Sequence, residues 1–178
     1  TKISADALVF SYYNSFGLPA TIVRPFNTFG PRQSARAVIP TVIIQLLNGA
    51  KKLKLGSLQP TRDFNYVLDT CAGFLAVANC DDTVGKTINI GSGRDISIGD
   101  TVNIIANLMQ IEIEIECDDK RLRPEKSEVA RLLCDNTLIK KLTGFAPSHT
   151  LEQGLYDTIE WLKEPNNLAR YKADLYNV

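Results

Sequence analysis

The feature that most constrains the fold of this chain is a regular alternation of helix-type and strand-type apolar spacing. Apolar residues between Ala5 and Phe16 recur at helical intervals, and Gly17 ends that stretch. The next run, Ala20 to Val23, is short, mostly apolar and β-branched, which is typical of a strand covered on both faces. The alternation continues along the chain, so the sequence predicts a mixed α/β fold with short connections.

The same criteria place the remaining elements. Apolar spacing predicts helices over 38–47, 98–109, 136–142 and 151–162, and strands over 52–55, 62–67, 87–90 and 111–116. Capping-box patterns that begin at Ser97 and at Thr150 support two of the helix starts. Asp69 is expected to cap a helix that carries Cys71, and residues 27–36 are expected to form a polar loop.

Composition narrows the function classes. The 178 residues carry 20 Lys+Arg against 20 Asp+Glu, and this zero net charge lacks the basic excess of a nucleic-acid-binding chain. No apolar run approaches the roughly 20 residues of a membrane-spanning helix, and no signal peptide opens the sequence. The four cysteines form no CxxC pair and there is one histidine, so no metal site is expected. These features predict a cytoplasmic chain that binds neither nucleic acid nor membrane.

A dinucleotide-binding fingerprint is missing. Such a unit begins with a strand, a G-x-G-x-x-G turn and a helix whose N-terminus holds the pyrophosphate. The segment from Gly91 to Gly93 precedes a helix, but it has only two glycines and the wrong register. An ordinary turn is therefore the better interpretation of this segment.

Three polar residues next to predicted strands are candidates for ligand binding. Asn27 follows a predicted strand, where ligands of parallel sheets bind, although spacing alone favours a turn amide. Arg62 precedes an apolar stretch, and its guanidinium suits either bidentate phosphate contact or a surface ion pair with Asp63. Asn89 lies in an otherwise apolar strand, and a buried amide there needs a hydrogen-bond partner, for which capping a loop is one interpretation.

Four ordered motifs carry a family resemblance that covers essentially the whole chain. They read RPFNTFGPRQSARAVIP from Arg24, TRDFNYVLD from Thr61, TINIGSG from Thr87 and RPEKSEV from Arg123. In this order they resemble the extended short-chain dehydrogenase/reductase family, and within it the NAD-dependent nucleotide-sugar epimerases and 4,6-dehydratases. The stretches GPRQSARAVIPT, RPEKSEV and YKADLYNV are most similar to the N-acetylhexosamine 4,6-dehydratases of legionaminic-acid biosynthesis.

The resemblance implies that residues 1–178 are the C-terminal part of a Rossmann-type α/β enzyme. The last parallel strands are then interleaved with the smaller substrate-binding lobe. Lys2 stands at the lysine of the family's Tyr-x-x-x-Lys motif, so the tyrosine and the N-terminal NAD-binding half are expected upstream, absent from this chain. The missing strands are expected to leave an open sheet edge and apolar helix faces, so we expect the isolated chain to associate.

The resemblance implies NAD as the cofactor. Lys2 is then the catalytic lysine, which hydrogen-bonds the nicotinamide ribose and lowers the pKa of the upstream tyrosine. The tyrosinate takes the proton of the substrate hydroxyl while hydride moves to NAD. Pro25 is implied to border the nicotinamide. Without the resemblance, Lys2 is a solvated terminal lysine.

The implied substrate is a UDP- or GDP-linked sugar. Asn27 is implied to contact its diphosphate, while Arg36 and the backbone near Val38 are implied to border the nucleobase. Arg62 and Arg123 are implied to clamp the diphosphate from two sides.

Further polar residues receive weaker assignments. Asn89 is implied to contact substrate phosphate, with the loop-capping role as the alternative. Lys126, Glu128 and Arg131 receive no role, because the spacing after Arg123 is longer than in the GDP-mannose dehydratases. A solvated charge run is their default interpretation.

These roles imply a parent enzyme that oxidises C4 of an NDP-N-acetylhexosamine, eliminates water across C5 and C6, and returns hydride to C6. The chain by itself is expected to be inactive. A 4-epimerase shares every motif and remains an alternative, as does a non-catalytic nucleotide-binding or dimerising module. The helix from Lys2 to Phe16 matches the family helix that packs in a dimeric four-helix bundle, which implies a homodimer; burial within its own subunit is the alternative.

The other polar features receive a structural interpretation. Glu112, Glu114 and Glu116 are expected to form the solvated face of one strand. His149 is expected in a surface loop without a nucleophile partner. The four cysteines lie mostly in apolar stretches and are expected to pack rather than to react.

Overall fold

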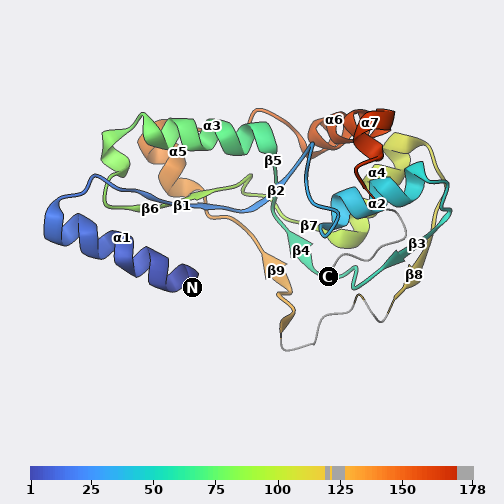
Figure 1. Cartoon of the computed structure of the whole chain (residues 1–178), viewed down its shortest axis with the longest axis horizontal. Coiled ribbons are helices and arrows are strands. Elements are labelled where there is room, and N and C mark those ends of the chain that lie inside the picture. The colour runs from blue at the N-terminus through green and yellow to red at the C-terminus, as the bar shows by residue number, and fades with distance from the viewer. Residues whose placement is uncertain (119–120, 122–126, 172–178) are drawn as a thin grey trace.

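The computed structural model describes residues 1–118, 121 and 127–171, which form a mixed α/β fold around two apolar clusters (Figure 1). The smaller cluster surrounds β1 (Ile22–Pro25) and β6 (Thr87–Ile90), which pair in parallel with Ile22 opposite Thr87. The helices α3 (Val67–Ala78) and α5 (Thr137–Thr143) cover one side of this pair, and α1 (Lys2–Phe16) lies on the other side.

The larger cluster is built mainly by helices. It joins α2 (Val38–Leu47), α4 (Ile98–Met109), α6 (Leu151–Lys163), α7 (Pro165–Leu168) and the parallel strands β3 (Lys52–Leu55) and β8 (Glu114–Cys117). Val42, Ile105 and Leu155 are fully buried at its centre. Since each buried apolar side chain contributes about 1.5–3 kcal/mol, this cluster is the main source of stability.

Short strands connect the two clusters. The strand β2 (Asn27–Phe29) pairs in parallel with β5 (Phe64–Tyr66), and a second sheet has the order β7 (Ile96–Ser97), β4 (Thr61–Arg62), β9 (Arg131–Leu132). A short 3-10 helix, η1, covers Asp81–Thr83. The polar residues of the site described below come from these connecting strands and the turns beside them.

Several predicted elements are confirmed. The predicted helix 38–47 is α2, and the strands 52–55 and 87–90 are β3 and β6. The helix α6 begins with a full capping box, in which Thr150 Oγ1 accepts from Gln153 N and Gln153 Oε1 accepts from Thr150 N. Ser97 Oγ likewise accepts from Asp100 N at the start of α4.

Other predictions are wrong in instructive ways. The strand at 20–23 begins at Ile22, and Arg24 and Pro25 at its end are exposed because, among the described residues, β6 is its one strand partner. The expected loop 27–36 begins with β2, which is paired with a segment 37 positions away, Asn27 opposite Phe64. The strand expected over 62–67 is split at Asp63, and the one expected over 111–116 begins at Glu114.

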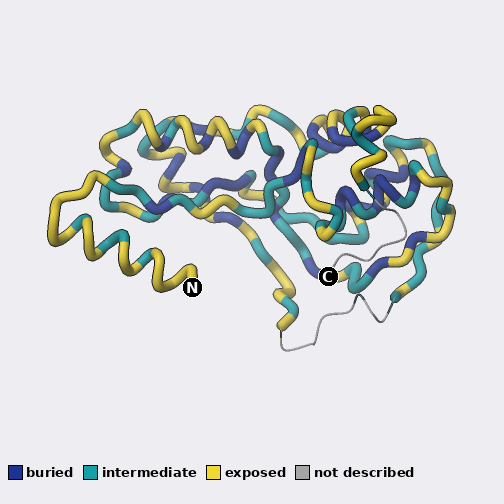
Figure 2. The backbone as a smooth tube through the Cα atoms, in the orientation of Figure 1, coloured by how far each residue is buried: buried dark blue, intermediate teal, exposed yellow. Residues whose placement is uncertain are grey.

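The helix α1 stands apart from both clusters. It has no buried residue, and its apolar side chains Ile3, Leu8 and Phe16 are 86%, 60% and 75% exposed. Exposed positions run along its whole length (Figure 2). Its contacts include an ion pair from Asp6 to Arg24 and the packing of the Tyr13 ring over Gly85.

Within the described residues, no helix is long and apolar enough to span a bilayer. The same part of the chain holds no group of three His, Cys, Asp or Glu side chains placed to bind a metal ion.

Candidate functional site

The connecting strands, the start of α2 and the turn after β3 enclose a cavity of about 460 Å³. Its polar wall carries Asn27, Gln33, Arg36, Arg62, Arg121 and Glu128, and its apolar wall includes Val38, Phe64 and Ile98. The structure therefore brings together four of the predicted substrate residues: Asn27, Arg36, Val38 and Arg62. The lining residues include three guanidinium groups and one carboxylate, and this excess of positive charge suits an anionic ligand.

Arg62 is held at the cavity by three acceptors. Its Nη1 donates to the carbonyl oxygens of Thr61 at 2.8 Å and Val129 at 2.7 Å, and its Nη2 donates to Glu128 Oε1 at 2.7 Å. The side chain is only 14% exposed, which orders the guanidinium in one orientation. The alternative ion pair with Asp63 is wrong, because the Asp63 carboxylate accepts from Ser92, Gly93 and Cys134 instead.

Two amides in the cavity wall have polar atoms without a protein partner. Asn27 Nδ2 and Gln33 Oε1 are buried and make no hydrogen bond within the described part of the chain. Gln33 Nε2 donates to the Thr28 carbonyl oxygen at 2.9 Å, which fixes the side chain beside β2. Since an unsatisfied buried amide is costly, Asn27 is a donor suited to an acceptor on a ligand.

Arg36 and Arg121 widen the positive side of the cavity. Arg36 is exposed in the loop that leads into α2, so it can move toward a ligand. Arg121 Nε pairs with Asp118 Oδ2 at 3.2 Å, and its side chain is 15% exposed.

Other predicted site residues are not brought to this cavity. Lys2 and Pro25 are exposed at one end of the β1–β6 pair, where the Asp6–Arg24 ion pair holds the first turns of α1 near the end of β1. Asn89 Nδ2 donates to the Asp135 carbonyl oxygen at 3.3 Å, which is the loop-capping alternative rather than a cavity position. Arg123 lies outside the described residues, as does Lys126.

Sequence reasoning missed Gln33, Arg121 and Glu128. Glu128 was interpreted as part of a solvated charge run, but it is the ion-pair partner of Arg62. Arg131 is solvated as expected, with its side chain 66% exposed, and its Nε donates to Asp95 Oδ2 at 2.8 Å. The charges of Glu128 and Arg131 do not predict their partners, since those partners lie 66 and 36 positions away in the sequence.

A second polar cluster joins the start of α3 to the loop before α6. The buried Asp69 carboxylate accepts from Ser148 N at 3.0 Å, Ser148 Oγ at 2.9 Å and His149 N at 3.2 Å, and its Oδ1 lies 2.9 Å from His149 Nδ1. Burial, the largest influence, raises the pKa of Asp69, but the hydrogen bonds from His149 and Ser148 together lower it below its usual value.

This cluster corrects two predictions. Asp69 lies inside α3, whose N-cap is Tyr66, and it holds a remote loop instead of capping the helix. His149 is partly buried and packs against the Tyr66 ring with centroids 4.9 Å apart. The Ser148 hydroxyl donates to Asp69 Oδ1 and its oxygen lies 3.1 Å from His149 Nδ1, so the three side chains form one cluster that fastens this loop to α3.

The cysteines differ in their surroundings. Cys134 is buried, and its burial together with the nearby Asp63 carboxylate raises its pKa to about 12, so the expectation of a packing residue is confirmed there. Cys71 and Cys117 are exposed, so the same expectation is wrong for those two.

Residues 1–158 match the family model described as GDP-mannose 4,6 dehydratase. The chain is 36% identical over 157 residues to a UDP-N-acetyl-alpha-D-glucosaminuronate decarboxylase of Bacillus cytotoxicus, an alignment that covers 85% of this chain and 48% of that relative. It is 29% identical over 184 residues to a dTDP-glucose 4,6-dehydratase of Escherichia coli, with 99% and 50% covered.

A solved structure is similar over the same region. The UDP-glucuronic acid 4-epimerase of Bacillus cereus, in complex with UDP-glucuronic acid and NAD, superposes with a TM-score of 0.82 at 27% identity. The alignment covers 92% of this chain and 51% of that structure. The chain thus spans about half the length of the curated relatives it matches.

Proposed function

The chain belongs to the extended short-chain dehydrogenase/reductase family of NAD-dependent nucleotide-sugar epimerases and dehydratases, and from this premise we propose that its full-length protein is an NDP-sugar 4,6-dehydratase. Family membership confirms the Rossmann-type α/β class that the motifs predict. In this proposal residues 1–178 supply the last parallel strands and the substrate-binding lobe. Sequence outside them supplies the NAD-binding half.

The observation that carries the proposal is the cavity around Arg62. It combines three guanidinium groups, an unpaired amide donor at Asn27 and an apolar wall at Val38 and Ile98. Guanidinium and amide donors suit a diphosphate, and an apolar wall suits a planar base. The volume, about 460 Å³, lies in the range of small-molecule sites.

Lys2 and Pro25 would serve the cofactor. They lie at one end of the β1–β6 pair, outside the cavity, so a nucleotide sugar and NAD can occupy different places and meet at the sugar. When bound, NAD would supply hydride transfer to and from the sugar. The residues of this chain bind and orient the diphosphate, and Lys2 presents a positive charge beside the cofactor ribose.

The reaction balances within the substrate. Oxidation at C4 acidifies the proton on C5, its loss expels the C6 hydroxyl as water, and the returned hydride with one proton completes a 4-keto-6-deoxy sugar. The N-acetylhexosamine as substrate rests on the RPEKSEV and YKADLYNV motifs.

Product analysis tests the reaction. The full-length protein is incubated with NAD and with UDP- or GDP-N-acetylglucosamine. The nucleotide sugars are then separated, and their masses are measured by mass spectrometry. A product lighter by one water supports the dehydratase. An isomer of unchanged mass identifies the 4-epimerase instead, and an unchanged substrate in both reactions contradicts the proposed function.

A homodimer is part of the proposal. The apolar side chains of α1 are exposed in this chain, and such a surface is stabilised by a matching surface on a second copy. The proposal includes a cytoplasmic location, because nucleotide sugar and NAD are both charged, soluble ligands.

A further inference from the structure

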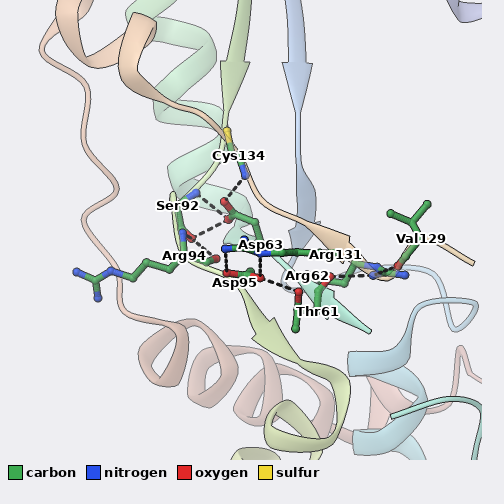
Figure 3. A network of polar contacts seen from close by, with 9 residues as sticks. All are labelled: Thr61, Arg62, Asp63, Ser92, Arg94, Asp95, Val129, Arg131 and Cys134. Atoms are coloured by element: carbon green, nitrogen blue, oxygen red, sulfur yellow. Dashed lines mark hydrogen bonds and ion pairs between the residues drawn. The ribbon is translucent and has the colours of Figure 1, made fainter. Parts of the chain in front are cut away.

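Asp63 is a fully buried carboxylate with an unusual set of partners. Its Oδ1 accepts from Ser92 N at 2.9 Å and Ser92 Oγ at 2.7 Å, and its Oδ2 accepts from Gly93 N at 2.9 Å and Cys134 N at 3.1 Å (Figure 3). Within the described residues, no lysine or arginine pairs with it. A buried carboxylate without a cation needs donors that are held firmly in place, so Asp63 ties its own segment to two remote ones, the turn at Ser92 and Gly93 and the segment of Cys134.

The carboxylate also sets how β9 lies against β4. Asp63 N donates to the Leu132 carbonyl oxygen at 2.9 Å, and Cys134 N donates to the Asp63 carboxylate. These two bonds on either side of position 133 hold the parallel register in which Arg62 lies opposite Leu132. A slip of one residue would break both bonds and leave the buried carboxylate short of a donor.

The register of β9 in turn determines what Arg62 meets. Val129 and Glu128 lie two and three positions before the first residue of β9. The Val129 carbonyl oxygen accepts from Arg62 Nη1, and the Glu128 carboxylate accepts from Arg62 Nη2. On the other side, Asp95 accepts from Thr61 Oγ1 at 2.6 Å and from Arg131 Nε at 2.8 Å, which joins the same strands a second time. Figure 3 shows both carboxylates beside the β4–β9 pair, with the Arg62 side chain directed toward Val129.

We propose that Asp63, which lies outside the cavity wall, is the positioning residue of the diphosphate site. By fixing β9 against β4 it orders the Arg62 guanidinium in the orientation that a phosphate needs. This inference rests on the proposed function for the identity of the ligand. An arginine that is ordered before binding loses less side-chain entropy when the ligand binds. Asp63 is therefore expected to raise the affinity for the phosphate groups and to leave the affinity for the base unchanged.

The test compares ligands that differ only in phosphate. Binding of UDP and GDP to the full-length protein is measured by calorimetry, and binding of uridine and guanosine by ligand-observed NMR. In Asp63→Asn we expect about tenfold or greater weakening for the diphosphate that binds, with less than about twofold change for its nucleoside. Arg62→Met is expected to show the same pattern, and the double variant no further loss.

Matched variants control for folding. Asp81→Asn makes the same chemical change at an exposed acid of η1 and is expected to leave both affinities unchanged. Ser92→Ala removes one of the four donors and keeps the carboxylate, so a smaller loss of about two- to fivefold, confined to the diphosphate, is expected. Should Asp63→Asn fail to fold, Ser92→Ala decides the question.

The outcomes separate the two proposals. If the wild type binds neither UDP nor GDP, the proposed function fails and the role of Asp63 with it. If the wild type binds one of them, and folded Asp63→Asn or Ser92→Ala binds it equally well, only the positioning role is overturned. Equal losses for diphosphate and nucleoside, or additive losses in the double variant with Arg62→Met, also overturn it.

Discussion

The two apolar clusters differ in how fully they are covered. Around Leu155, the helices α2, α4 and α6 bury an apolar core from several sides. Around Ile88, α3 and α5 cover the β1–β6 pair on one side, while α1 on the other side has no buried residue. Both regions belong to one chain, yet the first completes its own core and the second leaves apolar side chains such as Leu75 exposed. The arginines of the cavity adjoin the well-packed region, while Lys2 and Pro25 lie on the thinly covered one. Substrate binding is therefore expected to depend on this chain, and cofactor chemistry on what covers the second region.

The largest effect is expected in the larger core. Leu155→Ala removes a fully buried side chain and is expected to lower the free energy of unfolding by about 2–5 kcal/mol, because the cavity cannot refill. Urea denaturation followed by circular dichroism measures it. The matched Leu75→Ala, at a side chain 64% exposed in α3, is expected to change the value by less than about 0.5 kcal/mol. A reversed order would contradict the difference between the two regions.

The next effect concerns the ligand. Arg62→Met is expected to weaken nucleoside-diphosphate binding by about 10–100-fold, since a charge-assisted bond to phosphate is lost, as calorimetry can measure. Arg94→Met serves as a control, because Arg94 is exposed and does not line this cavity. If Arg62→Met and Arg94→Met bind the nucleoside diphosphate equally well, Arg62 does not contact the ligand.

A smaller effect is expected on self-association. Leu8→Glu places a charge on the exposed apolar surface of α1 and is expected to weaken dimerisation by about 1–2 kcal/mol with little change in the unfolding midpoint. Sedimentation velocity over a range of concentrations measures it, with Asn14→Glu on the same helix as the control. A wild type that stays monomeric throughout would contradict the dimer.

The smallest effect depends on pH. The hydrogen bond from Arg131, with that from Thr61, lowers the pKa of Asp95 from 3.8 to about 2. Because the folded-state pKa lies below the unfolded one, the stabilisation is present above about pH 4 and is lost as the pH falls through about 2. The difference in unfolding midpoint between wild type and Asp95→Asn is therefore expected to be small at neutral pH and to vanish near pH 2. A difference that grows on acidification would show that Asp95 acts in another way.

Local signals in the sequence determined the elements whose causes lie within a few residues. The apolar stripe of α2 and the capping box at Thr150 each depend on spacings of three or four positions, and both are found as predicted. The ordered motifs were also sufficient to identify the family, and they named four residues that line the cavity.

Tertiary structure decided what depends on contacts between distant positions. The pairing of β2 with β5, the contacts of Asp63, the ion pair of Arg62 with Glu128 and the bond from His149 to Asp69 join residues 29 to 80 positions apart. In each case a polar group had several chemically equivalent partners along the chain. Packing brought only one of them within hydrogen-bond distance, and no pattern of neighbouring residues encodes that choice.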